Sequence, residues 1–262
     1  MIIKNAYVFS ETAQFVKKDI FIAGQYITNS AVGGDELDAS DLYAIPGLID
    51  VHFHGCMGED FADGSLEALH TIAKYQANQG ITSICPATLT LPEEELLTAC
   101  RTAAEFEPED NEADVIGVHL EGPFVSKDKL GAQNPDYVQE ANVAMFSRLV
   151  EASGDLVRLI SLAPETMGAL PFIQAVSDEV VCSLAHTVAD YDTAKEAFDA
   201  GARHVTHLYN AMPPFLHREP GVIGAAFDNE EVMVELIADN VHIHPAVVRA
   251  TLALFGEDRV VF

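Results

Sequence analysis

Two histidines placed two residues apart are the side chains of this chain best suited to chemistry. His52 and His54 lie in the run Pro-Gly-Leu-Ile-Asp-Val-His-Phe-His-Gly at positions 46–55. Its apolar residues predict a buried strand, and these residues are Leu48, Ile49, Val51 and Phe53. Side chains alternate along a strand, so both imidazoles point to the same side. At the mouth of a barrel, such a pair is placed to hold one metal ion.

Four later segments also end in a histidine or an acid. Apolar runs lead to Glu121, His186, His207 and His242, and each run predicts a strand. Histidine nitrogen and carboxylate oxygen suit zinc, iron(II) or manganese, and a carboxylate such as Glu121 can bridge two ions. The pattern therefore predicts a centre of one or two divalent transition-metal ions. Ordinary hydrogen-bonded histidines are the alternative at any single position.

The elements that must position these residues alternate between strand and helix from position 46 onward. Strands are expected to end at 54, 89, 121, 163, 186, 207 and 242, and residues 259–262 begin an eighth strand. Helices are expected over 65–79, 92–106, 142–153, 166–177, 190–200 and 245–255, and long loops over 125–140 and 212–221. This alternation predicts an α/β fold, a (β/α)8 TIM-type barrel over 46–262 whose sites lie at the C-terminal ends of the strands. Residues 1–45 predict a small β element. A doubly wound open sheet is the alternative, but no Gly-x-Gly-x-x-Gly opens a helix.

Charge and composition narrow the class of protein further. Among 262 residues, 14 are basic and 41 acidic, which gives a formal net charge of −27 and argues against nucleic-acid binding. No run of 18 apolar residues predicts a membrane span, and the N-terminus turns polar too early for a secretory signal. The 4 cysteines have no Cys-x-x-Cys spacing. These features predict a cytoplasmic protein with reduced thiols.

The motifs together resemble the amidohydrolase superfamily and, within it, the N-acetylglucosamine-6-phosphate deacetylase family. The resemblance rests on the run at 46–55, His-Leu-Glu-Gly-Pro-Phe at 119–124, Ala-His-Thr at 185–187 and His-Val-Thr-His-Leu-Tyr-Asn-Ala-Met at 204–212. Arg-Glu-Pro-Gly at 218–221 and Asp-Asn-Val-His at 239–242 follow. His-Leu-Glu-Gly-Pro and His-Leu-Tyr-Asn-Ala-Met are specific to that family, and the resemblance covers essentially the whole chain.

The resemblance implies roles for individual residues. Glu121, His186 and His207 would hold the principal metal, and His52 and His54 would help to hold a second. The substrate contacts would come from Ala132, Asn210, Ala211, Arg218 and His242. The implied reaction is metal-dependent hydrolysis of the acetamide of N-acetylglucosamine 6-phosphate, which gives glucosamine 6-phosphate and acetate in amino-sugar catabolism. Members of the family commonly form homodimers.

Two positions depart from the family pattern. The family's acid/base aspartate lies at the end of strand eight, and this sequence stops at Phe262 before it. We therefore expect a C-terminally truncated chain, with no catalytic acid/base residue, with impaired hydrolysis and with half of the composite β-sandwich missing. A chain extended through strand eight tests this expectation. Gln133 stands where many members carry a histidine, and a glutamine cannot titrate.

Several readings remain open from the sequence. One alternative is a deacetylase for a related sugar phosphate such as N-acetylgalactosamine 6-phosphate. Another is an amidohydrolase for cyclic amides, which would not need Arg218. A third is an inactive sugar-phosphate-binding fragment. The sequence leaves open the metal and its number, the sugar epimer, the oligomeric state and the origin of the truncation.

Overall fold

A computed structural model describes residues 1–30 and 33–262. The chain divides into two compact units, Met1–Leu48 and Ile49–Phe262. Unit 1 contains β1 (Ile2–Phe9), β2 (Phe15–Ala23), β3 (Tyr26–Thr28), β4 (Glu36–Asp38) and β5 (Tyr43–Ala44). In its sheet β1 pairs with β2 antiparallel and with β4 and β5 parallel. These strands confirm the small β element that the sequence predicts within residues 1–45.

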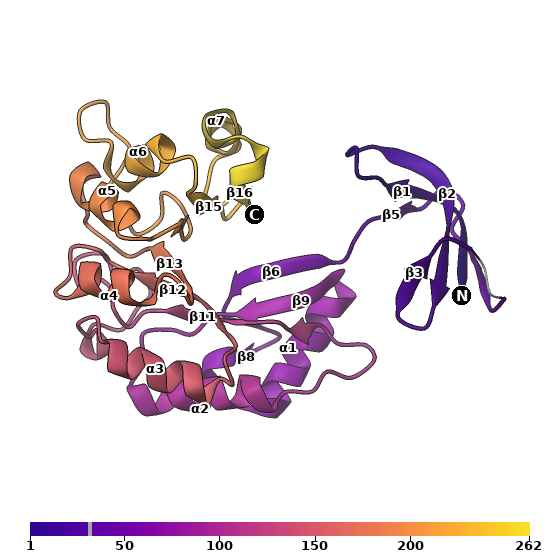
Figure 1. Cartoon of the computed structure of the whole chain (residues 1–262), viewed down its shortest axis with the longest axis horizontal. Helices are drawn as coiled ribbons and strands as arrows, with labels where there is room; N and C mark the ends of the chain where they lie inside the picture. Colours follow the sequence, from indigo (N-terminus) through magenta and orange to yellow (C-terminus); the bar gives the residue numbers. More distant parts are fainter. Residues whose placement is uncertain (31–32) are drawn as a thin grey trace. The chain divides into compact units, whose positions relative to one another are not determined.

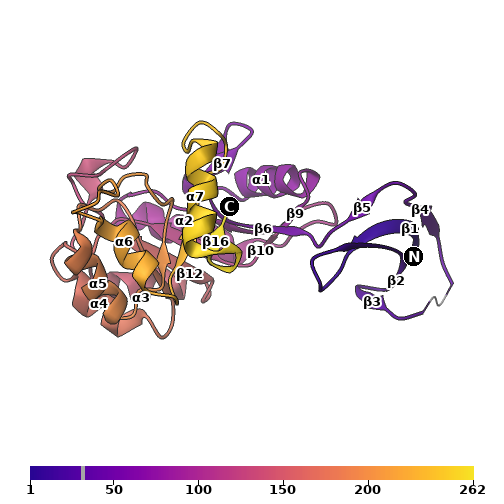
Figure 2. The ribbon, with the colours of Figure 1, turned by 90° about the horizontal axis from the view of Figure 1, so that it is seen from above.

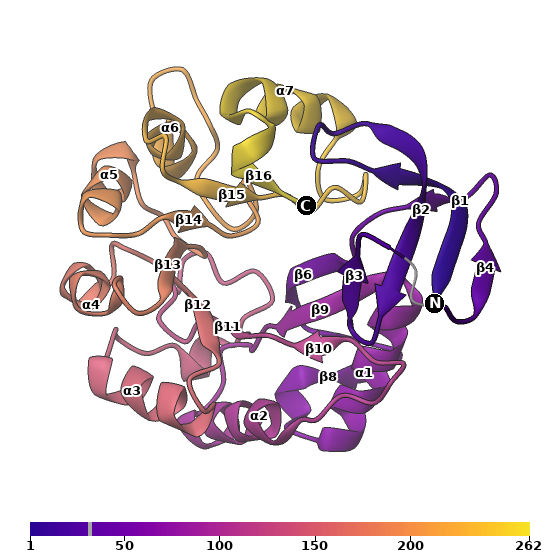
Figure 3. The ribbon, with the colours of Figure 1, turned by 45° about the vertical axis from the view of Figure 1, so that its right-hand side comes forward.

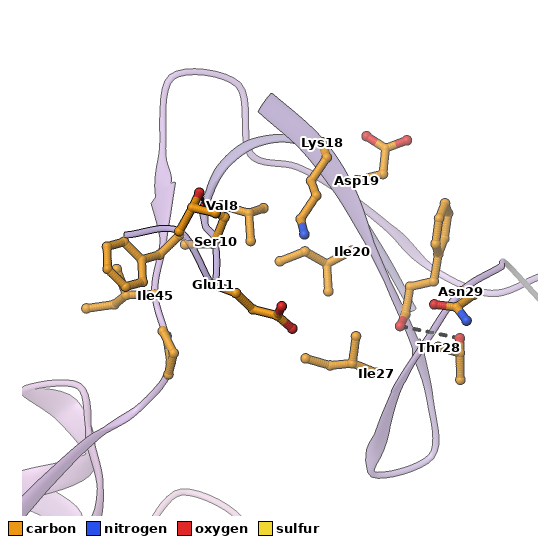
Figure 4. Close-up of a pocket in the computed structure, with 15 residues that line it drawn as sticks. Val8, Ser10, Glu11, Lys18, Asp19, Ile20, Ile27, Thr28, Asn29 and Ile45 are labelled. Atoms are coloured by element: carbon orange, nitrogen blue, oxygen red, sulfur yellow. Dashed lines mark hydrogen bonds between the residues drawn. The ribbon is translucent and has the colours of Figure 1, made fainter. Parts of the chain in front are cut away.

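Unit 1 leaves part of one sheet face open. A pocket there is lined by apolar side chains such as Val8, Ile20 and Ile27, with Lys18 and Glu11 at the same hollow (Figure 4). Tyr26 and Ile27 are 74% and 78% exposed. A three-residue strand such as β3 has few side chains with which to cover a sheet, so this unit has little core of its own.

Unit 2 follows the predicted alternation of strands and helices. Its strands are β6 (Leu48–Phe53), β9 (Ile81–Pro86), β10 (Asp114–Val115), β11 (Val118–Glu121), β12 (Val157–Leu162), β13 (Val181–Leu184), β14 (His204–Val205), β15 (Met233–Glu235) and β16 (Val260–Val261). Its α-helices are α1 (Leu66–Asn78), α2 (Glu93–Glu105), α3 (Val143–Ala152), α4 (Ala169–Val176), α5 (Tyr191–Asp199), α6 (Gly221–Asp228) and α7 (Pro245–Phe255). A short hairpin, β7 (Gly55–Cys56) with β8 (Glu59–Asp60), follows β6.

The strands of unit 2 pair in chain order. One sheet has the order β10-β9-β6, and a second runs from β11 through β12, β13, β14 and β15 to β16, with every recorded pairing parallel. The bridge between Ala87 and His119 joins the two sheets. The helices lie on the outside of the strands (Figures 1 and 3), and α7 lies beside β16 (Figure 2). This confirms the predicted barrel-type fold.

Local sequence signals explain where several helices begin. The side chains of Ser65, Asn142 and Asp190 accept hydrogen bonds from backbone N–H groups in the first turns of α1, α3 and α5. Between helices and strands lies a core of buried aliphatic and aromatic residues. Within it, the Phe172 ring packs edge-on against the rings of Phe124 and Phe146. Among the helices of the described residues, none has both the length and the apolarity needed to cross a membrane.

Three sequence expectations are wrong. The predicted strand does not reach His242: β15 ends at Glu235, because the Asp239 carboxylate accepts the N–H groups of Val241 and His242 and forms a turn there. The predicted loop over 212–221 is found, but the sequence analysis predicts no helix directly after it, where α6 lies, because the glycine and alanine residues of α6 lack the spacing of an amphipathic helix.

The burial expected at the start of β6 is the third error. Leu48 and Ile49 are 51% and 56% exposed, whereas Val51 and Phe53 are half-buried. The first residues of β6 lie at the boundary between the two units, and the packed core of unit 2 begins further along the strand. An apolar run therefore predicted the strand correctly but not its burial.

Candidate metal centre

The predicted metal ligands come from four strands of unit 2. His52 lies in β6 and His54 follows its last residue, while Glu121 is the last residue of β11. His186 and His207 each lie two residues after a strand, β13 and β14 respectively. The carboxyl ends of parallel strands meet at one end of a barrel, so residues far apart in the sequence converge there.

The five side chains meet around the carboxylate of Glu121. Its Oε1 lies 3.1 Å from His207 Nε2, 3.2 Å from His186 Nε2 and 3.4 Å from His52 Nε2. Its Oε2 lies 3.3 Å from His54 Nε2. All four imidazoles thus present the same ring nitrogen, Nε2, to one buried carboxylate. The structure brings these predicted ligands together in a single cluster.

Three of the four imidazoles are oriented through the opposite ring nitrogen. His52 Nδ1 lies 2.8 Å from Glu235 Oε2, His54 Nδ1 lies 3.3 Å from the Ala87 carbonyl oxygen, and His186 Nδ1 lies 3.0 Å from the Lys129 carbonyl oxygen. A carbonyl or carboxylate only accepts, so Nδ1 carries a proton in each ring, and with a metal bound the neutral ring would offer its Nε2 lone pair. This is the tautomer that ligates a metal through Nε2.

The backbone at two of these histidines is in the left-handed region. His186 and His207 have φ values of 44° and 35°, and Tyr209 and Ala211 also have positive φ. Such backbone is uncommon for residues other than glycine, costs about 1–3 kcal/mol per residue and concentrates at functional sites. The turns after β13 and β14 therefore direct His186 and His207 toward Glu121 with a strained backbone.

The electrostatics of the cluster favour an ionised carboxylate. Burial opposes ionisation of Glu121, but hydrogen bonds from the surrounding imidazoles hold its pKa well below the usual value. Burial likewise opposes protonation of His52, yet hydrogen bonds to Glu121 and Glu235 raise its pKa to about 10. A positive charge is thus strongly favoured between these carboxylates, and a divalent cation supplies it as a proton does.

The donor set suits a divalent transition metal. Glu121, His186 and His207 offer ligand atoms within 4.8 Å of one another, and so do His52, His54 and Glu121. His186 Nε2 and His207 Nε2 lie 3.1 Å apart, and both face Glu121 Oε1. Imidazole and carboxylate ligands without thiolates fit zinc, iron(II) or manganese. The residues present therefore fit either one ion or two that share Glu121.

Gln133 has a role that the sequence did not reveal. Its side-chain Nε2 donates to Glu121 Oε2 at 2.6 Å, and its Oε1 accepts the Thr90 N–H at 2.6 Å. Gln133 is buried, and it ties the loop 125–140 to the central carboxylate. An amide supplies both a donor and an acceptor, so no titratable group is needed for this contact.

Replacing Gln133 by leucine is expected to destabilise the chain by about 1–3 kcal/mol, because the buried Thr90 N–H loses its acceptor and Glu121 loses a donor. Urea unfolding measures the loss. Gln139→Leu, in the same loop at a half-buried position, is the control and is expected to change stability by less than about 0.5 kcal/mol. Equal effects of the two substitutions would contradict this role.

Three of the predicted substrate contacts lie close to the cluster. A Cβ at Gly131 would be 3.3 Å from His186 Cε1 and 3.9 Å from Ala211 Cβ, so the segment with Ala132 passes beside this ligand. Asn210 is half-buried, and its Nδ2 donates to the carbonyl oxygens of His207 and Leu208. Asn210 and Ala211 therefore belong to the same turn as His207 and lie beside it.

The other two predicted contacts lie on exposed loops. Arg218 is exposed and lines a pocket with Pro213, Glu219 and other loop residues. His242 is also exposed, and its Nδ1 lies 2.7 Å from Asp239 Oδ2. Neither is part of the residue groups that could hold a metal in the described residues.

The sequence comparison identifies a family. Residues 43–261 match the amidohydrolase family. The chain is 36% identical over 227 residues to an N-acetylglucosamine-6-phosphate deacetylase of Bacillus subtilis, with 85% of this chain and 57% of that protein covered. It is also 36% identical over 203 residues to an N-acetylgalactosamine-6-phosphate deacetylase of Escherichia coli O157:H7, with 77% of this chain and 54% of that protein covered. The chain thus spans a little over half the length of these relatives.

A solved structure is similar as well. It is an N-acetyl-D-glucosamine-6-phosphate deacetylase of Mycobacterium smegmatis, an aspartate-to-alanine variant in complex with N-acetyl-D-glucosamine-6-phosphate. The TM-score is 0.88 at 28% sequence identity, with 99% of this chain and 69% of that chain covered.

Proposed function

The chain belongs to the amidohydrolase family, and we propose on that premise that it serves metal-dependent hydrolysis of the acetamide of N-acetylglucosamine 6-phosphate, which yields glucosamine 6-phosphate and acetate. The observation that carries the proposal is the convergence of four imidazole Nε2 atoms on the carboxylate of Glu121. The similarity to deacetylases of this substrate supports the choice of amide.

The residues divide the work between them. Glu121, His186 and His207 would hold one ion, and His52 and His54 with Glu121 a second. A bound zinc, iron(II) or manganese lowers the pKa of water and polarises an amide carbonyl. Gln133 keeps the buried carboxylate of Glu121 in place through its amide. We propose that Ala132, Asn210 and Ala211 line the substrate beside this cluster.

The phosphate of the substrate needs a local cation. With a formal net charge of −27, the chain as a whole repels an anion. Arg218 and His242 are the proposed phosphate contacts, since a guanidinium binds phosphate through two parallel hydrogen bonds. Both side chains lie on exposed loops, where a phosphate in solution can reach them.

The epimer N-acetylgalactosamine 6-phosphate is the second candidate substrate. The relative of Escherichia coli O157:H7 that acts on it is as identical to this chain as the relative of Bacillus subtilis. The two sugars carry the same acetamide and the same phosphate, so the metal centre and the phosphate contacts serve either one.

Acetate release tests the proposal. The chain is loaded with zinc, iron(II) or manganese and given both N-acetylated sugar phosphates and unphosphorylated N-acetylglucosamine. We expect metal-dependent acetate release that is slower in this chain than in a chain extended through strand eight and faster with a phosphorylated sugar, and we expect saturable binding of that sugar. Binding without any release would favour the sugar-phosphate-binding alternative, and equal turnover of the unphosphorylated sugar would contradict the proposed substrate.

Replacing Arg218 by alanine is expected to weaken binding of the sugar phosphate by about 10- to 100-fold, because a charged hydrogen-bond partner of the phosphate is lost. Isothermal titration with the glucosamine 6-phosphate product measures the affinity. Arg101→Ala, an exposed arginine on α2, is the matched control and is expected to leave the affinity unchanged. An unchanged affinity in Arg218→Ala would remove this residue from the phosphate site.

A further inference from the structure

We propose that Glu235 is a positioning residue of the metal centre, which fixes the ring of His52 and holds the turn that carries His207. This inference rests on the metal centre of the proposed function and extends it to a residue outside the five proposed ligands, although His52, His119 and Glu235 also offer ligand atoms within 4.8 Å of one another. Glu235 is the last residue of β15, and it is 6% exposed. The sequence predicts that this strand ends at His242, but the structure ends it at Glu235.

One carboxylate oxygen of Glu235 contacts two of the proposed ligands, His52 and His207. Oε2 lies 2.8 Å from His52 Nδ1 and accepts the backbone N–H of His207 at 3.3 Å. The backbone carbonyl oxygen of Glu235 accepts the Leu208 N–H at 2.9 Å. A single residue thus orients an imidazole from β6 and anchors the strained turn after β14. Both ligands would shift if this carboxylate were removed.

The partner of His52 differs in kind from those of the other oriented imidazoles. His54 and His186 donate to neutral carbonyl oxygens, whereas His52 donates to a charged carboxylate. A carboxylate behind a histidine ligand fixes the tautomer and strengthens the ligand more than a neutral acceptor does. His52 should therefore depend on its partner more than His54 or His186 does.

A chain of buried polar groups leads from His119 to the other side of Glu235. Each side chain in it lies within 2.9 Å of the next, in the order His119, Ser161, Thr206, Ser183 and His204. His204 Nε2 then lies 3.6 Å from Glu235 Oε1. These groups are buried, and Glu235 Oε1, which accepts no hydrogen bond from the described residues, lies beside the end of this chain. Glu235 is thus buried behind His52, where its carboxylate can orient this ligand.

The experiment compares Glu235→Gln and Glu235→Leu with a matched pair elsewhere in the fold. His70 Nδ1 lies 2.8 Å from Glu112 Oε2, the same distance as in the pair of His52 with Glu235, and it lies outside the residue groups that could hold a metal in the described residues. Glu112→Gln and Glu112→Leu therefore break an equal contact without touching the centre. Zinc affinity is measured by competition with a chromophoric chelator, and thermal unfolding of the metal-free chains reports folding.

In Glu235→Leu we expect zinc affinity at the His52 site to fall by about 10- to 100-fold, with a smaller loss in Glu235→Gln, which keeps an acceptor but no charge. His52→Ala combined with Glu235→Leu should lose less zinc affinity than the two single losses together, because only the contact with the His207 turn is then left to lose. The Glu112 variants should bind zinc as the unsubstituted chain does. Unchanged affinity in folded Glu235→Gln and Glu235→Leu, or an equal loss in the Glu112 variants, would overturn the inference. No zinc binding by the unsubstituted chain would overturn the metal centre itself.

Discussion

Replacing Glu121 by glutamine is expected to weaken metal binding by more than about 100-fold, because the central anionic ligand is lost, and loss of an outer contact alone costs about 10- to 100-fold. The carboxylate lies within 3.4 Å of four imidazole nitrogens, and it is the ligand that both proposed ions share. The glutamine amide is neutral, and its NH2 group only donates hydrogen bonds and offers no lone pair to a metal ion. No other side chain of the cluster affects as many contacts.

The same substitution should also destabilise the metal-free chain. Removing one partner of a buried ion pair costs up to about 3–5 kcal/mol, because the remaining charge loses compensation. His52 would keep only Glu235 as its carboxylate partner. Metal content after dialysis against zinc measures the first effect, and urea unfolding measures the second.

Glu112→Gln is the matched control for this prediction. The side chains of Glu112 and Glu121 are each 3% exposed, and both pair with histidine. Glu112→Gln is expected to bind zinc normally. Normal zinc content in Glu121→Gln would refute the assignment of Glu121 as a ligand, and a comparable loss of zinc in Glu112→Gln would mean that the effect arises from general destabilisation.

The parts of this site that the sequence predicted share one physical origin. His52, Glu121 and His207 each stand at or just past the end of an apolar run, and parallel strands bring such positions to one end of a barrel. The strand pattern and the residue types are both local properties of the sequence. The parallel arrangement of the strands then brings these side chains together.

The residues that the sequence did not reveal act through long-range contacts. The sequence pattern places Glu235 inside a strand that continues to His242. Nothing in the local sequence distinguishes an acidic residue at the end of a strand from one in its interior. The turn formed by Asp239 ends that strand early, and only the fold then shows Glu235 behind His52. Gln133 is similar, since its contact with Glu121 joins a loop to a strand.

Removing metal from the chain is expected to lower its stability, with a shift of roughly 5–10 °C in the unfolding midpoint. A ligand at about 100 times its dissociation constant stabilises the native state by about 2.7 kcal/mol, and for a chain of this size each kcal/mol moves the midpoint by roughly 2–4 °C. In the metal-free centre, the negative charge of Glu121 is balanced only by imidazoles, and His52 must carry a proton between two carboxylates. Bound zinc would supply the positive charge in place of that proton, and the four Nε2 atoms would be available to hold one ion or two.

Thermal unfolding after chelation, followed by stepwise return of zinc, measures this shift. Magnesium is the discriminating control, because it prefers oxygen ligands and should not stabilise a site built mainly from imidazoles. Glu121→Gln should show almost no response to zinc, which ties the shift to the cluster and not to the exposed acids that dominate this chain. An equal shift with magnesium, or a full response in Glu121→Gln, would place the stabilising ion elsewhere. The comparison thus separates a specific centre from general screening of a chain with a formal net charge of −27.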